Sequence, residues 1–124
     1  MSAKNVALCR ALGYVARKER TGYWSMSLNG QCDNMAYFDE TDAYKRGVPD
    51  YATDISAGLA ALDATGKPYE LRRSITRNCH YYKIYKDDYV DESSDNANGK
   101  GATQAEACFA ALCADYHVEV SSGD

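Results

Sequence analysis

Two carboxylates, Asp50 and Asp54, stand four residues apart in the stretch GVPDYATDISAGLAAL. Such a pair can act as general acid and base or bind Mg²⁺, but only with further groups that converge on it, and no neighbouring residue supplies them. Asp50 follows Pro49 and is expected to be the N-cap of a helix. Asp54 then lies in the first turn, where it complements the helix dipole. We therefore interpret the pair as a helix entry.

The cysteines and histidines offer two further arrangements for catalysis or metal binding. Cys79 and His80 are adjacent, so on a strand their side chains point to opposite faces and cannot work together as nucleophile and base. Cys113 and His117 have the spacing of two ligands on one helix face, but a zinc site needs more ligands and Cys108 is turned away around the helix. We expect buried thiols and a surface histidine, with no metal and no cofactor.

The segment HYYKIYKDDY combines four tyrosines with two lysines. Exposed tyrosines can form a protein interface, or can stack on a nucleotide whose charge the cations neutralise, and strand preference alone explains several of them. The acidic residues that follow are expected in a solvated loop, with a surface for a basic partner as the alternative. The predicted partner-binding residues are Tyr81, Tyr82, Tyr85, Asp87, Asp88, Tyr89, Asp91 and Glu92. The alternative residues for an anion or nucleotide are Arg72, Arg73 and Lys83.

The segment GKGAT, from Gly99 to Thr103, has a glycine-lysine pair before a predicted helix, as phosphate-binding turns do. A P-loop requires a further glycine four variable positions before Gly-Lys, and Ser94 stands at that position. The sequence therefore argues against a P-loop, and a bound anion at the helix start stays open as an alternative.

These candidate residues lie on predicted helices and strands. Apolar residues at helical spacing between start and stop signals predict helices over 2–13, 50–66 and 103–116, the last with a capping box from Thr103 to Glu106. Aromatic or alternating segments next to turn residues predict strands over 14–19, 22–30, 35–38, 69–76 and 80–86. The stretch 39–49 has no clean period and is predicted to be a loop.

The predicted order is α-β-β-(β)-α-β-β-α, which is typical of an α+β fold with an antiparallel sheet covered by helices. A chain of 124 residues can bury one continuous core, so a single domain over 1–124 is predicted. Residues 92–102 are expected to form a flexible loop, and 118–124 a tail or short strand.

Composition limits the partners and the compartment. The chain has 14 basic and 18 acidic residues, a net charge of −4, so strong binding to nucleic acid is not expected. Five cysteines without regular close spacing argue against a disulfide framework. No apolar run is long enough for a signal peptide or a membrane span. A cytoplasmic protein that does not bind membranes is therefore expected.

Two stretches, VPDYATDISAGLAALDA and GKGATQAEACFAALCA, carry a resemblance to a known family. Over about 47–114 the chain resembles small bacteriophage accessory proteins of the phage ABA-sandwich domain family, in which two such helices flank a sheet. The matching residues are Pro49, Asp50, Tyr51, Asp54, Ala57, Ala61, Leu62, Ala105, Ala107, Cys108, Ala110, Ala111 and Leu112. The resemblance implies a phage or prophage product that binds a host protein, as inhibitors of CRISPR and other defence systems do.

We therefore predict a phage-encoded, non-catalytic binding protein in the cytoplasm of an infected bacterial host. It is expected to inhibit a bacterial defence system, in the manner of an anti-CRISPR protein, by contact with a host bacterial protein. The alternative is a protein that binds and sequesters a signalling nucleotide. A cryptic enzyme ranks third, because no nucleophile and base are assembled in the sequence.

Overall fold

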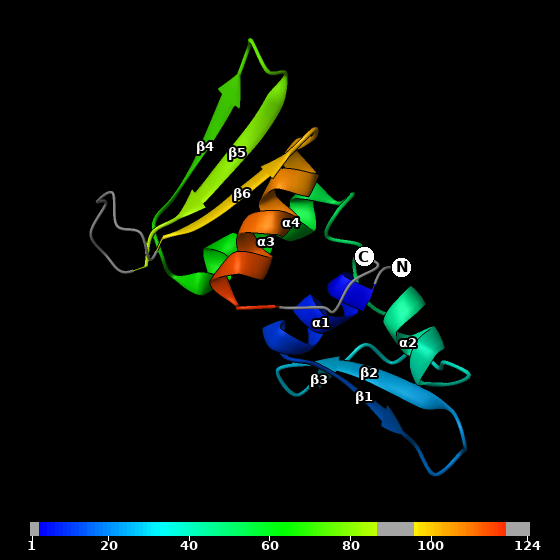
Figure 1. Cartoon of the computed structure of the whole chain (residues 1–124). Coiled ribbons are helices and arrows are strands. Elements are labelled where there is room, and N and C mark those ends of the chain that lie inside the picture. The colour runs from blue at the N-terminus through cyan, green and yellow to red at the C-terminus, as the bar shows by residue number, and fades with distance from the viewer. Residues whose placement is uncertain (1–2, 87–95, 119–124) are drawn as a thin grey trace. The chain divides into compact units, whose positions relative to one another are not determined.

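The computed structural model describes residues 3–86 and 96–118. These residues divide into two compact units, 3–49 (unit 1) and the described part of 50–118 (unit 2), each built from helices and one antiparallel sheet (Figure 1). None of the helices in this part of the chain has the length and apolar character needed to cross a membrane.

Unit 1 contains two helices and a three-stranded sheet in the order β1-β2-β3. Its elements are α1 (Ala3–Leu12), β1 (Tyr14–Lys18), β2 (Trp24–Leu28), β3 (Gln31–Cys32) and α2 (Glu40–Arg46). The predicted helix and the first two predicted strands are thereby confirmed. The third strand of the sheet is β3, and not the predicted strand over 35–38. Within 35–38 only Tyr37 pairs with β2, in a single bridge to Trp24.

The core of unit 1 lies between the helices and one face of the sheet. Met26, at the centre of β2, is buried, and α2 packs against both β1 and β2. The buried Asn5 of α1 donates a hydrogen bond from Nδ2 to the carbonyl of Pro49, 3.0 Å away, so a polar group in the core is satisfied. The buried residues are Asn5, Leu8, Cys9, Met26, Tyr37, Ala43, Tyr44 and Val48.

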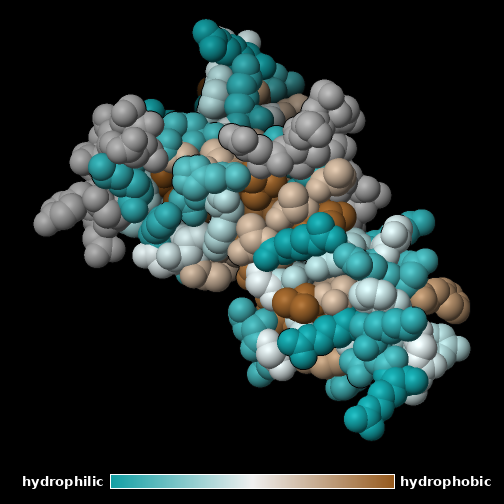
Figure 2. All heavy atoms as spheres, turned by 60° about the horizontal axis from the view of Figure 1, so that its bottom comes forward, coloured by the Kyte–Doolittle hydropathy of each residue, from teal (hydrophilic) through white to brown (hydrophobic). Residues whose placement is uncertain are grey.

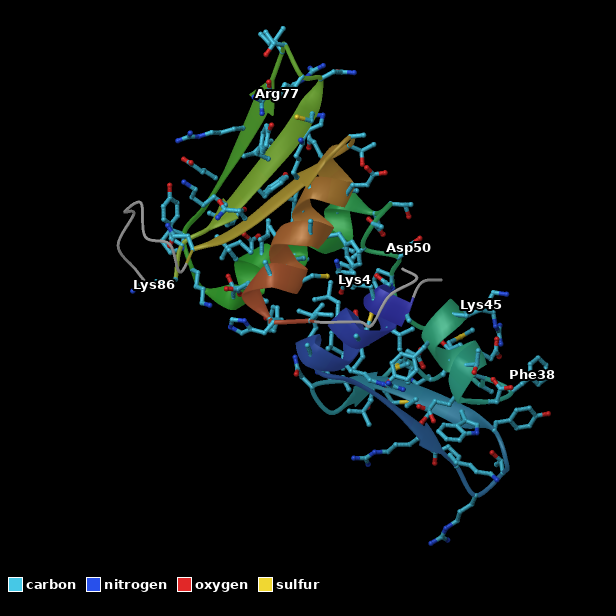
Figure 3. All side chains as sticks on the ribbon, viewed as in Figure 1. Lys4, Phe38, Lys45, Asp50, Arg77 and Lys86 are labelled. Atoms are coloured by element: carbon cyan, nitrogen blue, oxygen red, sulfur yellow. The ribbon has the colours of Figure 1, made fainter. Side chains whose placement is uncertain are left out.

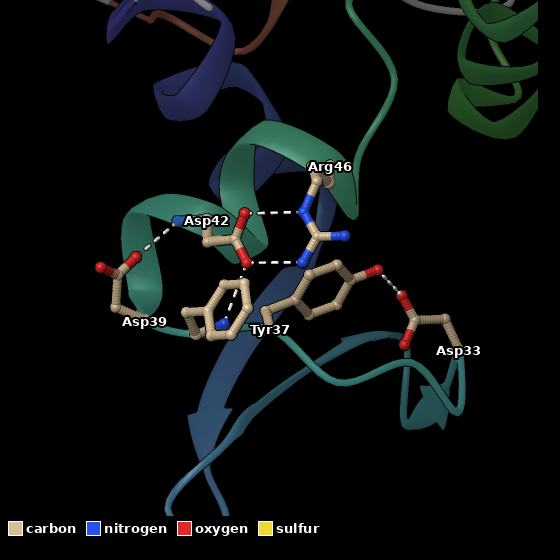
Figure 4. A network of polar contacts seen from close by, with 6 residues as sticks. Asp33, Tyr37, Asp39, Asp42 and Arg46 are labelled. Carbon is tan, nitrogen blue, oxygen red and sulfur yellow. Dashed lines mark hydrogen bonds and ion pairs between the residues drawn. The ribbon is translucent and has the colours of Figure 1, made fainter.

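Helix α2 replaces the loop that the sequence predicts over 39–49, and polar contacts hold it (Figure 4). Asp39 caps the helix by accepting a hydrogen bond from the Asp42 N–H at 2.7 Å. Asp42 accepts two hydrogen bonds from Arg46, at 2.7 and 2.6 Å, and one from the Phe38 N–H at 2.9 Å. These hydrogen bonds, chiefly those from Arg46, lower the pKa of the Asp42 carboxyl to about 2. The loop prediction is therefore wrong over 40–46.

Unit 2 has the strand order β4-β5-β6, with all pairs antiparallel. Its elements are α3 (Ile55–Thr65), β4 (Tyr69–Ser74), β5 (Cys79–Ile84), β6 (Ala97–Gly101) and α4 (Gln104–Asp115). Helix α4 lies along β6 and β5 on one face of the sheet, and α3 packs on α4 (Figure 1). The hairpin of β4 and β5 extends past the end of β6.

Strand β6 lies within the segment predicted as a flexible loop over 92–102, and that prediction is wrong for 97–101. Its two glycines let α4 approach the backbone of the strand. A Cβ on Gly99 would lie 2.2 Å from the carbonyl oxygen of Ala107, and one on Gly101 would lie 2.6 Å from the N atom of Ala107. These glycines therefore serve helix packing, not a phosphate-binding turn.

The two long helices of unit 2 start with side-chain caps. Asp54, and not Asp50, is the N-cap of α3, because its Oδ1 accepts from the Ala57 N–H at 3.1 Å. Asp50 instead opens the preceding turn, in which its carbonyl accepts from the Asp54 N–H at 2.9 Å. The expectation that Asp50 caps the helix is thus wrong by one turn, while the assignment of both carboxylates to the helix entry agrees with the structure.

The capping box of α4 is confirmed. Thr103 Oγ1 accepts from the Glu106 N–H at 3.1 Å, and Glu106 Oε2 accepts from the Ala102 N–H at 3.1 Å. The α+β class is confirmed as well. The strands form two sheets, whereas the sequence predicts one, and the single domain over 1–124 stays a prediction.

Candidate functional site

The sheet of unit 2 presents two faces of different character. Gly99 and Gly101 meet α4, so the register positions beside them belong to the helix-covered face. Because side chains alternate along a strand, the intervening positions point to the other side. There Arg72 of β4, Tyr81 of β5 and Lys100 of β6 stand directly opposite one another in one row.

A second row lies beside the first, with Glu70 of β4, Lys83 of β5 and Asn98 of β6. A groove of about 560 Å³ runs along this side of the sheet and is lined by both rows. We call the six residues the basic face: Glu70, Arg72, Tyr81, Lys83, Asn98 and Lys100. Three cations and one carboxylate make the basic face positive, in a chain whose net charge is −4.

Two of the three cations of the basic face, Arg72 and Lys100, are exposed, while Lys83 is half-buried. Arg72 Nη2 lies 3.0 Å from Glu70 Oε1, an ion pair without hydrogen-bond geometry, and 67% of the Arg72 side chain is exposed. Lys83 Nζ lies 5.8 Å from the ring centroid of Tyr85. Lys100 is exposed between its two glycine neighbours. The guanidinium therefore keeps most of its surface for a second anion.

The structure buries two of the tyrosines that the sequence predicts on the partner surface. Tyr82 and Tyr85 are only 2% and 3% exposed, so the expectation that they form an exposed surface is wrong. Tyr82 shares the helix-covered face with Ile84, and burial raises the pKa of its hydroxyl. Tyr81, one position earlier, is half-buried and lies on the basic face. The other predicted partner-binding residues, Asp87, Asp88, Tyr89, Asp91 and Glu92, lie outside the described residues.

The predicted anion-binding residues divide between the two faces. Arg72 and Lys83 come together on the basic face, in neighbouring rows. Arg73 also borders the groove, but its register position is shared with His80 and Gly101 on the helix-covered side. Its side chain is therefore not aligned with those of Arg72 and Lys83.

Sequence reasoning missed the contribution of β6. The sequence pattern places Lys100 in a candidate phosphate-binding turn and Asn98 in a predicted loop, so neither is predicted to lie on a strand. The signal that could have found them is the alternation in ANGKG, where polar residues take every second position between small ones. Small residues on one side permit close helix packing, and that packing turns Asn98 and Lys100 to the opposite side.

The structure shows where the residues considered for catalysis and metal binding lie. Cys79 and His80 lie on opposite faces of β5, as expected. Helix α4 ends at Asp115 and His117 has φ +55°, so Cys113 and His117 do not share a helix face. Within 3–86 and 96–118, no group of three or more His, Cys, Asp or Glu side chains is arranged to hold a metal ion.

The expected state of the cysteines is confirmed: all five are free thiols, and four are buried while Cys32 is exposed. Burial raises the pKa of the Cys108 thiol to about 12, so this group stays protonated and unreactive at neutral pH. The cysteines of unit 2 are therefore core residues.

Comparison of the chain with protein-family models, with curated proteins and with solved structures gives no match. The resemblance to phage ABA-sandwich proteins therefore stays a prediction.

Proposed function

We propose that this protein acts without catalysis, by binding, and that its basic face binds a nucleotide. The observation that carries the proposal is the row of Arg72, Tyr81 and Lys100, in which an aromatic ring has a cation on each side. Side chains directly opposite on neighbouring strands have their Cβ atoms about 4.5–5.5 Å apart. A base stacked on Tyr81 would therefore place its phosphates within reach of either cation.

The second row adds to the proposed recognition. Lys83 supplies a third cation, and the Asn98 amide can donate to and accept from the polar edge of a base. The groove has the volume of a small-molecule site, and the net charge of −4 disfavours a long polyanion. A mononucleotide or short oligonucleotide of the signalling type fits these features better than a nucleic-acid strand.

The proposal is tested with a panel of nucleotides, by thermal shift and then by calorimetry. We expect one class to stabilise the protein, because a ligand that binds only the folded state raises its stability. Arg72→Ala and Lys100→Ala should each weaken binding about tenfold, which is about 1.4 kcal/mol for a charge-assisted contact. Tyr81→Ala should remove stacking and weaken binding to a similar degree.

Arg77→Ala is the matched control. Arg77 lies in the exposed turn after β4, at the end of the hairpin in Figure 3, and has the same charge as Arg72 without bordering the groove. Its loss should leave affinity unchanged. Equal effects of Arg72→Ala and Arg77→Ala would show that only the overall charge matters, and no stabilisation by any nucleotide would remove the proposal.

A second candidate function is inhibition of a bacterial defence protein by direct contact, and an exposed aromatic cluster in unit 1 offers a surface for such a contact. The rings of Tyr23 and Phe38 have centroids 6.3 Å apart, and the Arg46 guanidinium lies 6.0 Å from the Phe38 centroid. Phe38 is 76% exposed and points away from the ribbon in Figure 3. In Figure 2, hydrophilic residues predominate on the face shown, and hydrophobic residues are interspersed among them.

Aromatic residues and arginine dominate the energetic centres of protein interfaces, so this cluster is the part of unit 1 best suited to a partner. If the second function holds, a host defence effector should co-purify at one-to-one stoichiometry, and Phe38→Ala should weaken the complex at least tenfold. Ile75→Ala, which removes an exposed apolar side chain from unit 2, is the control and should have no effect. A complex that tolerates Phe38→Ala would contradict the assignment.

A further inference from the structure

We infer that the outer edge of β4 pairs with β4 of a second copy of this chain, antiparallel and centred on Leu71, to form a symmetric dimer. This inference concerns the edge of the sheet and does not depend on the ligand of the basic face. It starts from the position of β4, which has β5 on one side and, among the described residues, no strand on the other.

The edge of β4 is suited to pairing. An unprotected edge strand presents a row of backbone N–H and C=O groups to any strand that can align with it. β4 has six residues, and it exposes apolar side chains: Tyr69 is 37% and Leu71 44% exposed. Both lie on the helix-covered side of the sheet, where α4 packs on β5 and β6 and has no extensive contact with β4.

Symmetry restricts the register of such a pair. A twofold axis perpendicular to the sheet keeps each side chain on its face, so one residue must stand opposite itself. Centring on Glu70, Arg72 or Arg73 would set like charges against each other, which is unfavourable in cross-strand pairs. Centring on Tyr69 or Ser74 would overlap a single residue of the strand. Leu71 is the remaining centre.

The register centred on Leu71 is complementary in charge and shape. Glu70 stands opposite Arg72 of the second copy, and Arg72 stands opposite Glu70. The 3.0 Å ion pair between Glu70 and Arg72 within each strand therefore becomes part of a cluster of four alternating charges. On the other face, the two Leu71 side chains meet, and each Tyr69 ring faces Arg73 of the second copy. Each strand thus contributes an ion pair and a cation–π contact.

The dimer also extends the basic face. Because the axis is perpendicular to the sheet, both grooves open on the same side of one six-stranded sheet. Arg72 of each copy then lies beside the groove of the other, so each copy contributes a cation next to its neighbour's site. Pairing of edge strands is a common way to remove an exposed edge.

Charge reversal tests the interface. Sedimentation equilibrium over a wide range of protein concentration should show a monomer–dimer equilibrium. Glu70→Arg alone and Arg72→Glu alone should each raise the dissociation constant at least tenfold, since each sets like charges opposite. The double variant exchanges the charges and should restore dimerisation, which also shows that the single variants did not act by misfolding. Arg77→Glu, outside the pairing, should dimerise like the wild type.

Disulfide trapping tests the register, in a Cys32→Ser background that removes the exposed native thiol. Leu71→Cys stands opposite itself and should give a disulfide-linked dimer under mild oxidation. Ile75→Cys is the control: Ile75 is 91% exposed, but it lies four residues from the axis and should cross-link far more slowly. A monomer at every concentration, failure of the charge exchange to restore the dimer, or equal cross-linking of the two cysteines would overturn the inference.

Discussion

Gly99→Ala is expected to lower the free energy of unfolding of unit 2 by about 3 kcal/mol, at the upper end for overpacked interiors. The added Cβ would lie 2.2 Å from both the Ala107 carbonyl oxygen and the Ala111 N atom. Both atoms belong to the backbone of α4, so no side-chain rotation can relieve the overlap. Relief requires α4 to move away from β6, its most extensive contact.

Urea unfolding followed by circular dichroism measures this effect. Lys100→Ala is the matched control on the same strand, because its side chain lies on the basic face and away from α4. Its effect should stay within about 0.5 kcal/mol, as for most surface substitutions. A Gly99→Ala protein as stable as the control would mean that α4 is not packed on β6 as closely as the structure has it.

The second large effect is a loss of stability at alkaline pH that depends on Cys108. Burial raises the pKa of this thiol from 9.0 to about 12 in the folded protein. Between these values the unfolded chain loses the proton while the folded protein keeps it, so the unfolded state binds fewer protons and stability falls as pH rises. The slope approaches about 1.4 kcal/mol per pH unit for one thiol. Below pH 9 the contribution is fully present.

Comparison with Cys108→Ala isolates this effect, because the other titrating groups are shared by both proteins. Between pH 8 and pH 10.5 the wild type should lose about 2 kcal/mol more than the variant. Cys32→Ala, which removes an exposed thiol, is the control for the loss of a thiol as such. Parallel profiles for the wild type and Cys108→Ala would contradict the burial of Cys108 against α3, where its Sγ would lie 2.8 Å from a Cβ on Gly58.

Binding of nucleotide and pairing of β4 would share two residues, Glu70 and Arg72, while other residues belong to one proposal only. The two proposals therefore have separable outcomes. Lys100→Ala affects only the groove, because β6 is at the opposite edge of the sheet. Leu71→Cys affects only the pairing, because Leu71 lies on the helix-covered face. A protein that binds nucleotide as a monomer, or that dimerises without binding nucleotide, would refute one proposal and leave the other standing.

The elements predicted well from the sequence are those whose signals are local. Thr103 and Glu106 satisfy backbone donors within one turn, so the start of α4 follows from four residues. The hairpin of β4 and β5 follows from alternation around a short turn that contains Asn78 at φ +49°. Such signals need no distant partner, and the sequence alone determines them.

Helix α2 and the cap of α3 depended on more than the local pattern. α2 has few apolar residues, and it is held by Asp39 and the pair of Asp42 and Arg46, whose cooperation no apolar period reveals. Asp50 and Asp54 are equally good caps by type. In the structure Asp54 is the cap. Tyr51, which lies between the two aspartates, is buried in the core and belongs to the turn that precedes the helix.

The site shows the same division between local and distant causes. By itself the sequence determined the α+β class, the capping box of α4, the strand pair that carries Arg72 and Lys83, and the reduced state of the buried cysteines. Only the tertiary structure decided that Tyr82 and Tyr85 are core residues, and that β6 brings Lys100 beside Tyr81. The physical reason is that the alternation of side chains along a strand is a local property, whereas the helix that packs on the sheet decides which face is buried. Here α4 packs where Gly99 and Gly101 leave room for it.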